Sequence, residues 1–265
     1  MSQTENTPVM PAVFAGHGSP MNAIESNQFT ENWKKLGESI PRPKLIVCIS
    51  AHWETKGTFL TSMPHPKTIH DFYGFPQELF RVEYPAPGNP GYAEQIALKY
   101  PELQIGLDKE NWGFDHGSWS VVRHIYPNAD IPMLQLSLNR NLSFAEHYEL
   151  AKKLSYLRSE GVLIIGSGNI VHNLRAVDWH NASGGFEWAE EANSQIRQWI
   201  AEKNHNELTN ITQRGGIYRM AIPTAEHYLP LLYVLAMQHE ADKVSFFNDE
   251  LTLGSISMTG VILKN

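Results

Sequence analysis

Cysteine is nearly absent from the sequence, which holds only Cys48 in 265 residues. A lone cysteine excludes an intrachain disulfide framework, and its place in the apolar run LIVCIS predicts a buried thiol. The polar first ten residues lack the basic and apolar regions of a secretory signal. No apolar run approaches the roughly 18 residues of a membrane-spanning helix. We therefore expect a cytoplasmic protein without a membrane partner.

Positive charge is also scarce. Lysine and arginine number 21 against 28 acidic residues, which gives a formal net charge of -7. No broad basic surface is then expected, so nucleic acid is excluded as a partner. The proportions of 42% hydrophobic and 18% charged residues are typical of a globular chain. The length predicts a single domain over residues 1–265, but the sequence does not indicate its oligomeric state.

Several catalytic motifs with fixed spacing are missing. The sequence has no phosphate-binding Walker motif, no GxSxG elbow and no HExxH. The stretch GSGN at 166–169 lacks the third glycine of a dinucleotide fingerprint. Nothing marks Ser167 as a nucleophile rather than a small residue at a strand end.

The pattern of short apolar runs and longer amphipathic ones predicts an α/β fold, with a central, mainly parallel sheet flanked by helices. The helix from 143 to 161 has Ser143 as cap, Glu146 at the capping-box position and Gly161 at its end. Two segments rich in Pro, Gly and aromatics, 63–80 and 83–91, are predicted as ordered loops that contribute to a site. The other predicted helices cover about 29–36, 187–203 and 228–237, and the strands cover 11–16, 44–51, 57–62, 131–138, 162–168, 243–247 and 255–263.

Histidine, in contrast, is abundant, and its placement is informative. Three of the twelve histidines, His17, His52 and His172, stand at or just after predicted strands. In open α/β sheets ligands bind beyond the carboxyl ends of the strands, so these imidazoles are expected to converge there. His227, at a helix start, and His116, between Asp115 and Gly117, are further candidates.

A neutral imidazole is the commonest protein ligand for zinc, iron and related metals. His17 stands between two glycines in VFAGHGSP, where bare backbone allows a sharp turn and leaves room for a metal and its substrate. The ligands are distant in sequence, however, so their spacing is a weak signal. The nearby aromatics Trp112, Phe114 and Trp119 are predicted to be core residues rather than a ligand wall.

Seven segments together resemble the LigB-type class III extradiol ring-cleavage dioxygenases, in particular the branch that cleaves DOPA. They run in order from residue 16 to residue 233, and they are GHGSPM, SAHW, TIHDFYGFP, YPAPG, WGFDHGSW, SGNIVHNL and PTAEHYLPLLY. The resemblance implies a non-haem Fe(II) enzyme that opens a catechol such as L-DOPA with O2. It also implies an α/β fold with the metal at the strand ends.

The resemblance assigns roles to individual residues. His17 and His52 match the paired histidine ligands, and His116 and His172 match groups that act as acid, base or oxygen-positioning residues. His172 is also a candidate ligand in the DOPA branch. For the third ligand, usually glutamate in this family, we favour His227, with Glu226 as the alternative. Such a site would also hold Zn(II), which is then expected in purified protein without being the working metal.

Two alternatives use the same residues. A zinc hydrolase would activate water at His17, His52 and His227 and would need no O2. A non-catalytic metal-binding protein is possible on any widespread scaffold. The retention of five candidate histidines argues against the second, because a binder does not need titratable groups beside its ligands.

Overall fold

The computed structural model describes residues 9–265. The first residues of the predicted 1–265 domain therefore lie outside the described part. The same is true of most of the segment in which we expect no secretory signal. The fold is the expected single α/β domain, built on an eight-stranded sheet. Among the described residues, none of the helices combines the length and apolarity needed to cross a bilayer.

The strands of this sheet follow the order β5-β3-β7-β2-β8-β1-β12-β9. At the centre, β7 (Met133–Asn139), β2 (Leu45–Thr55), β8 (Val162–Gly168) and β1 (Ala12–Gly16) are all parallel. On one side β12 (Gly260–Lys264) and β9 (Lys243–Phe247) add antiparallel pairs. On the other side β3 (Phe59–Thr61) pairs antiparallel with β7 and parallel with β5 (Gly106–Asp108). The parallel centre brings the carboxyl ends of four strands to one edge.

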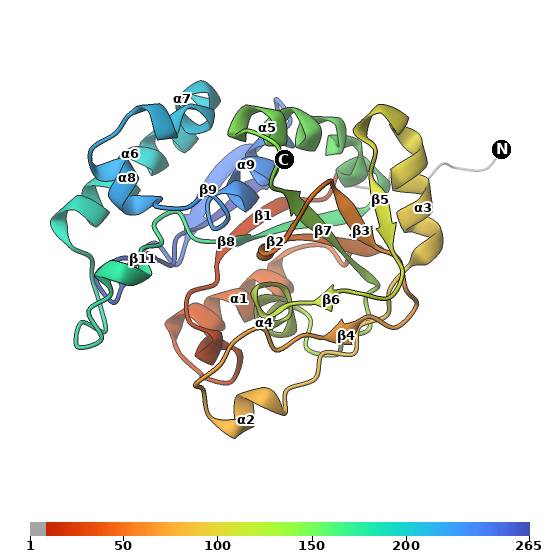
Figure 1. Ribbon diagram of the computed structural model, residues 1–265, viewed down its shortest axis with the longest axis horizontal. Coiled ribbons are helices and arrows are strands. Elements are labelled where there is room, and N and C mark those ends of the chain that lie inside the picture. The colour runs from red at the N-terminus through yellow and green to blue at the C-terminus, as the bar shows by residue number, and fades with distance from the viewer. Residues whose placement is uncertain (1–8) are drawn as a thin grey trace.

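Helices cover both faces of the sheet, and Figure 1 shows α5 and α9 on one side and α1 and α4 on the other. The buried side chains form two clusters, with alternate residues of β1 facing each: Ala12 and Phe14 face one, Val13 and Ala15 the other. This alternation reflects the period of two along a strand. The principal helices are α1 (Gln28–Ser39), α3 (Pro90–Lys99), α4 (His116–Ile125), α5 (Phe144–Lys153), α6 (Glu187–Ala201) and α9 (Leu229–Ala236).

Short elements complete the fold. They are the helices α2 (Gln77–Phe80), α7 (His205–Thr209) and α8 (Ile217–Ala221), and the strands β4 (Lys67–Thr68), β6 (Gly113–Phe114), β10 (Leu251–Thr252) and β11 (Ile256–Ser257). Short 3-10 helices are η1 (Pro20–Ala23), η2 (Pro101–Leu103), η3 (Ser155–Glu160), η4 (Leu174–Ala176) and η5 (Ile211–Gln213).

The structure corrects several predicted boundaries. The helix expected over 143–161 divides into α5 and η3, although Ser143 and Glu146 do form a reciprocal capping box. Gly161 ends the segment with a φ of 84°. The strand expected at 255–263 divides into β11 and β12, and the one expected at 44–51 continues to residue 55. Helix α3 lies partly in the predicted loop 83–91, and helix α4 was not predicted.

Candidate metal centre

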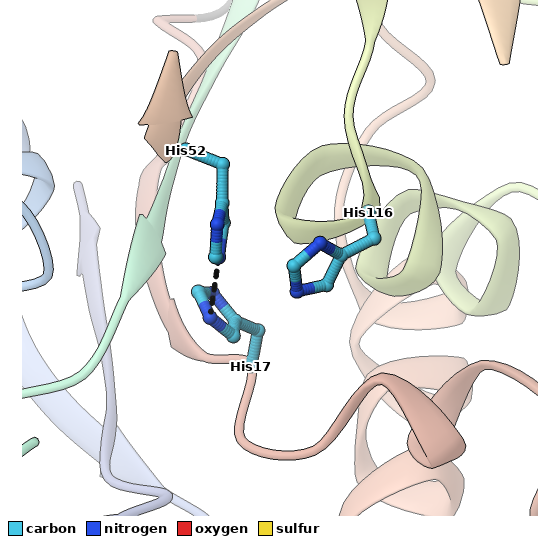
Figure 2. A group of neighbouring side chains, drawn as sticks. All are labelled: His17, His52 and His116. Carbon is cyan, nitrogen blue, oxygen red and sulfur yellow. Dashed lines mark hydrogen bonds between the residues drawn. The ribbon is translucent and has the colours of Figure 1, made fainter. Parts of the chain in front are cut away.

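Five histidine side chains converge beyond the carboxyl ends of β1, β2 and β8. His17 follows β1 directly, His52 lies in β2, and His116 is the first residue of α4. His172 follows β8, and His227 immediately precedes the Tyr228 cap of α9. Figure 2 shows the rings of His17, His52 and His116 directed into one space from three separate elements. The structure thus brings together every histidine that the sequence singled out.

Local backbone features aim these rings. The register of β2 against β7 shifts between Ile49 and Glu54, where five residues of β2 advance against two of β7. An irregularity of this kind redirects side chains, and His52 lies within it. At the start of α4, Asp115 caps the helix by accepting the N–H of Ser118 at 3.0 Å. Gly117 lets this helix approach, since a Cβ there would meet the His52 ring at 2.7 Å.

The glycines beside His17 have a different role from the one expected. Gly18 has a φ of +61°, which confirms a sharp turn. The room beside both glycines, however, is filled by Met258 and not by a cavity for a metal. A Cβ on Gly16 would lie 2.6 Å from the Met258 backbone, and one on Gly18 would lie 2.4 Å from its sulfur. These glycines therefore allow the segment before β12 to pack under the His17 turn.

The hydrogen-bond network fixes the proton positions of His17. The Ser167 hydroxyl donates to the carbonyl of Gly117, so its oxygen is left to accept from Nδ1 of His17 at 3.0 Å. His17 is then the Nδ1–H tautomer, with a free lone pair on Nε2. Ser167 is therefore a hydrogen-bond partner and not a nucleophile.

A carboxylate faces the Nδ1 atoms of two more rings. Asp71 Oδ2 lies 3.4 Å from Nδ1 of His52, and Asp71 Oδ1 lies 3.0 Å from Nδ1 of His116. The backbone N–H of His116 also donates to Oδ1 at 2.8 Å. A carboxylate only accepts, so both rings are directed toward the tautomer with Nε2 free. Sequence reasoning missed Asp71, although it lies in the loop 63–80 predicted to contribute to a site.

The electrostatic environment keeps four of the rings neutral, those of His17, His52, His172 and His227. Burial, followed by the neighbouring imidazoles, lowers the pKa of His17 and of His227 well below the ordinary value. Burial and then His116 lower the pKa of His52 to about 3, and burial lowers the pKa of His172 to about 4. Burial acts to raise the pKa of Asp71, but the contacts of its carboxylate with the His116 side chain and backbone N–H outweigh burial and leave this pKa lowered. At neutral pH the centre thus combines unprotonated nitrogens with an ionised carboxylate.

The ring geometry is that of a shared ion. Nε2 of His17 and Nε2 of His52 lie 3.3 Å apart. Two ligands about 2.0–2.1 Å from a tetrahedral zinc are separated by about 3.3–3.4 Å. The donor atoms of His17, His52 and His116 lie within 4.8 Å of one another, and so do those of His172, Glu226 and His227. The residues therefore fit a divalent metal.

The fold and this centre define an α/β protein with a histidine metal site at the ends of parallel strands. Residues 7–263 match the family described as the catalytic LigB subunit of aromatic ring-opening dioxygenase. The chain belongs to this family, and it is an aromatic ring-opening dioxygenase that cleaves catechols in the extradiol manner.

Individual relatives agree with the family assignment. The chain is 46% identical over 256 residues to the 4,5-DOPA dioxygenase extradiol of Escherichia coli K12, covering 95% of this chain and 94% of that protein. It is 34% identical to the protein of the same name from Beta vulgaris, with 92% of each chain covered. A crystal structure of an uncharacterised Escherichia coli K12 protein matches with a TM-score of 0.83 and 41% identity, covering 96% of this chain and 99% of that one.

Proposed function

We propose that this enzyme cleaves L-DOPA, or a closely similar catechol, between carbons 4 and 5 with O2 at an Fe(II) held by His17, His52 and His227. One observation carries the metal-centred proposal. Nε2 of His17, at the 3.3 Å contact with Nε2 of His52, bears a lone pair because its Nδ1–H donates to Ser167, and the Asp71 carboxylate 3.4 Å from Nδ1 of His52 favours a lone pair at Nε2 of that ring as well. Two facing lone pairs repel, and a cation between them removes the repulsion.

His227 is the third ligand in this proposal. Its ring centroid lies 5.2 Å from that of His17 and 5.1 Å from that of His52, and the His17–His52 separation is also 5.1 Å. The three rings thus form a nearly equilateral triangle. Glu226, the alternative ligand, has Oε1 3.1 Å from Nδ1 of His227 and accepts the Thr224 hydroxyl. We therefore assign Glu226 to orienting the His227 ring.

His172 is assigned to proton transfer rather than to the metal. Its ring stacks on His227 with centroids 3.4 Å apart and an interplanar angle of 8°. The lone pair of an imidazole nitrogen lies in the ring plane, and these two planes are nearly parallel, so the two rings in this stack would not direct their lone pairs at one ion. Coordination of the same ion by both rings would require His172 to leave the stack.

His116 and His172 are the acid–base pair of the proposed reaction. When bound, the metal supplies open positions for the catechol oxygens and O2, and it allows electrons to pass between them. A neutral His172 or His116 accepts the second catechol proton at Nε2, a step worth about 10² to 10⁴ in rate. The protonated ring then returns the proton during O–O cleavage. Both oxygen atoms of O2 end in the ring-opened semialdehyde, one in its aldehyde and one in its carboxylate, and this product would cyclise with loss of water to a yellow pigment when DOPA is the substrate.

The names of the relatives support DOPA as the substrate, and the redox chemistry supports iron as the working metal. Zn(II) fits the same donors and is expected to compete in purified protein. A cytoplasmic location and the absence of nucleic-acid and membrane partners stay predictions.

The test is anaerobic reconstitution of the metal-free protein with Fe(II), followed by L-DOPA and then air. We expect a yellow ring-opened product that appears only after O2 is admitted and only with iron. Zn(II)-loaded protein is the control and should give no colour. Failure to open L-DOPA, protocatechuate or other catechols would contradict the proposal. Ester or amide hydrolysis by the Zn(II) form without O2 would favour the hydrolase instead.

A further inference from the structure

The Asp71 carboxylate reaches two histidines that have different tasks in the proposed reaction. We propose that Asp71 is a positioning residue that holds the ligand His52 and the acid–base residue His116 as Nδ1–H tautomers, with both Nε2 lone pairs directed into the metal centre. This inference rests on the proposed function for those two tasks. The contacts themselves are the 3.4 Å and 3.0 Å approaches of its two oxygens to the two Nδ1 atoms.

The Asp115 carboxylate, which is also near His116, cannot do this. Asp115 is adjacent to His116 in sequence, but its side chain accepts the N–H of Ser118 and a hydrogen bond from the Gln135 amide. It is fully buried and engaged in starting α4. Asp71 comes instead from the loop between β4 and α2, 45 residues earlier than His116.

The surroundings of His116 hold its ring against the carboxylate. Phe72, next to Asp71, meets the His116 ring edge-on with centroids 5.5 Å apart, and the His52 ring lies 4.0 Å away on another side. The Nδ1 contact with Asp71 is short but not aligned as a hydrogen bond. Catalytic hydrogen bonds are often poorly aligned until substrate binds. The backbone N–H of His116 nevertheless anchors Oδ1 at 2.8 Å.

The two oxygens are not equivalent, and this asymmetry makes a sharp test. In Asp71→Asn the amide oxygen should occupy the Oδ1 position, because the His116 backbone N–H needs an acceptor there. The new NH2 group then faces Nδ1 of His52. His52 must accept that hydrogen, which moves its own proton to Nε2 and blocks metal binding. His116 should keep its tautomer.

The experiment measures metal binding and tautomers without turnover. Zn(II) affinity is measured by competition with a chromophoric chelator, and the tautomers of His52 and His116 by ¹⁵N NMR of the metal-free protein. Changes to such outer partners typically cost 10–100-fold in metal affinity. We expect Asp71→Asn to bind Zn(II) at least about 10-fold more weakly and to shift His52 alone to Nε2–H.

The matched control is Glu54→Gln, which removes an acid two residues beyond His52 whose ion-pair partner is Arg140. It should keep the wild-type tautomers and Zn(II) affinity. An Asp71→Asn protein with wild-type affinity and an Nδ1–H His52 would overturn the inference. If that variant does not fold, the wild-type spectrum decides, since an Nε2–H form of either ring contradicts the proposal. Neither readout needs catechol cleavage, so failure of the proposed function would be seen separately.

Discussion

Buried polar groups gather at both ends of the parallel strands, but the two clusters are organised differently. At the carboxyl ends lie the five histidines, with Nε2 of His17 and Nε2 of His52 3.3 Å apart. At the amino ends Arg158, which lies in η3 shortly before β8, is fully buried with Asp242. Its five N–H groups all find acceptors, in the Asp242 carboxylate and in the carbonyls of Met10, Met237 and Leu263. Burial acts to raise the pKa of Asp242, but Arg158 outweighs it and keeps the carboxyl ionised.

The difference separates structure from function. A closed network in which every donor has an acceptor stabilises a fold and leaves nothing for a ligand to satisfy. In the histidine cluster the Nδ1 atoms of His17 and His227 are hydrogen-bonded, while Nε2 of His17 and Nε2 of His52 face each other. Buried nitrogens that lack a protein partner are available to a ligand such as a metal ion. Four predictions test this contrast.

The largest effect is expected at a ligand. Structural zinc sites are worth about 10–16 kcal/mol, so one of four ligands contributes up to about 4 kcal/mol, or about 10³-fold in affinity. His227→Ala should therefore lose about 10³-fold in metal affinity and all measurable ring cleavage. Glu226→Gln should lose only about 10-fold, because the amide oxygen can still accept from Nδ1 of His227. Metal titration of both variants checks this, and the reverse ranking would make Glu226 the third ligand.

The acid–base residue should show a different signature. His172→Gln removes a proton acceptor stacked on His227 but, in our assignment, no ligand. We expect kcat to fall about 10²- to 10⁴-fold while Zn(II) affinity stays within a few-fold of wild type. Steady-state kinetics of the Fe(II) enzyme and chelator competition give the two numbers. A large loss of metal affinity would instead place His172 among the ligands.

Substitution in the Arg158–Asp242 network should change the stability of the protein and not its activity. Arg158→Met leaves the Asp242 charge buried without a partner, which should lower the free energy of unfolding by about 3–5 kcal/mol. Urea unfolding measures this loss. Ring cleavage per folded molecule should not change, because Arg158 lies at the opposite end of the strands. The double variant Arg158→Met with Asp242→Leu should recover most of the stability, and failure to do so would show that the carbonyl contacts of Arg158 dominate.

Much of the fold was predictable, because a buried parallel strand such as 162–168 is a continuous apolar run and needs no tertiary information. Helix α5 was predictable for a local reason too, since the two residues of its capping box, Ser143 and Glu146, are only three positions apart in the sequence. Helix α4 was not. Its sequence HGSWSVVRHI combines glycine, serine and β-branched valines, which are weak helix formers, so local propensity does not favour a helix there.

The histidines of the candidate site were predictable from the sequence, but their hydrogen-bond partners were not. Histidines placed after apolar runs were expected to converge, because strand ends of a parallel sheet share one edge. Their partners could not be assigned, since a hydrogen bond from His17 to Ser167 spans 150 residues. Asp71 had only a weak signal, as one acid in a loop of prolines and aromatics. The orientation of Glu226 toward its neighbour likewise depends on side-chain geometry that sequence does not encode locally.

The smallest effect concerns a buried histidine outside the centre. His147 of α5 is 1% exposed and contacts the Tyr233 hydroxyl at 2.9 Å, and burial lowers its pKa to about 4. In the unfolded chain the pKa is about 6.5, so between these values the unfolded state binds more protons and stability falls as pH falls. One such group contributes a slope of up to about 1.4 kcal/mol per pH unit.

His147→Gln should remove this part of the slope between about pH 6.5 and 4, measured by urea unfolding across that range. The matched control is His65→Gln, at an exposed position that is hydrated in both states. Saturating Zn(II), where it stays bound, separates the contribution of the centre, because metal keeps its ligands unprotonated while His147 has no such protection. If the Zn(II)-loaded protein lost no stability toward pH 4, while the His147→Gln slope equalled that of wild type, His147 would not be buried in the neutral form. A charged His147 would then have to be stabilised by an additional partner inside the protein.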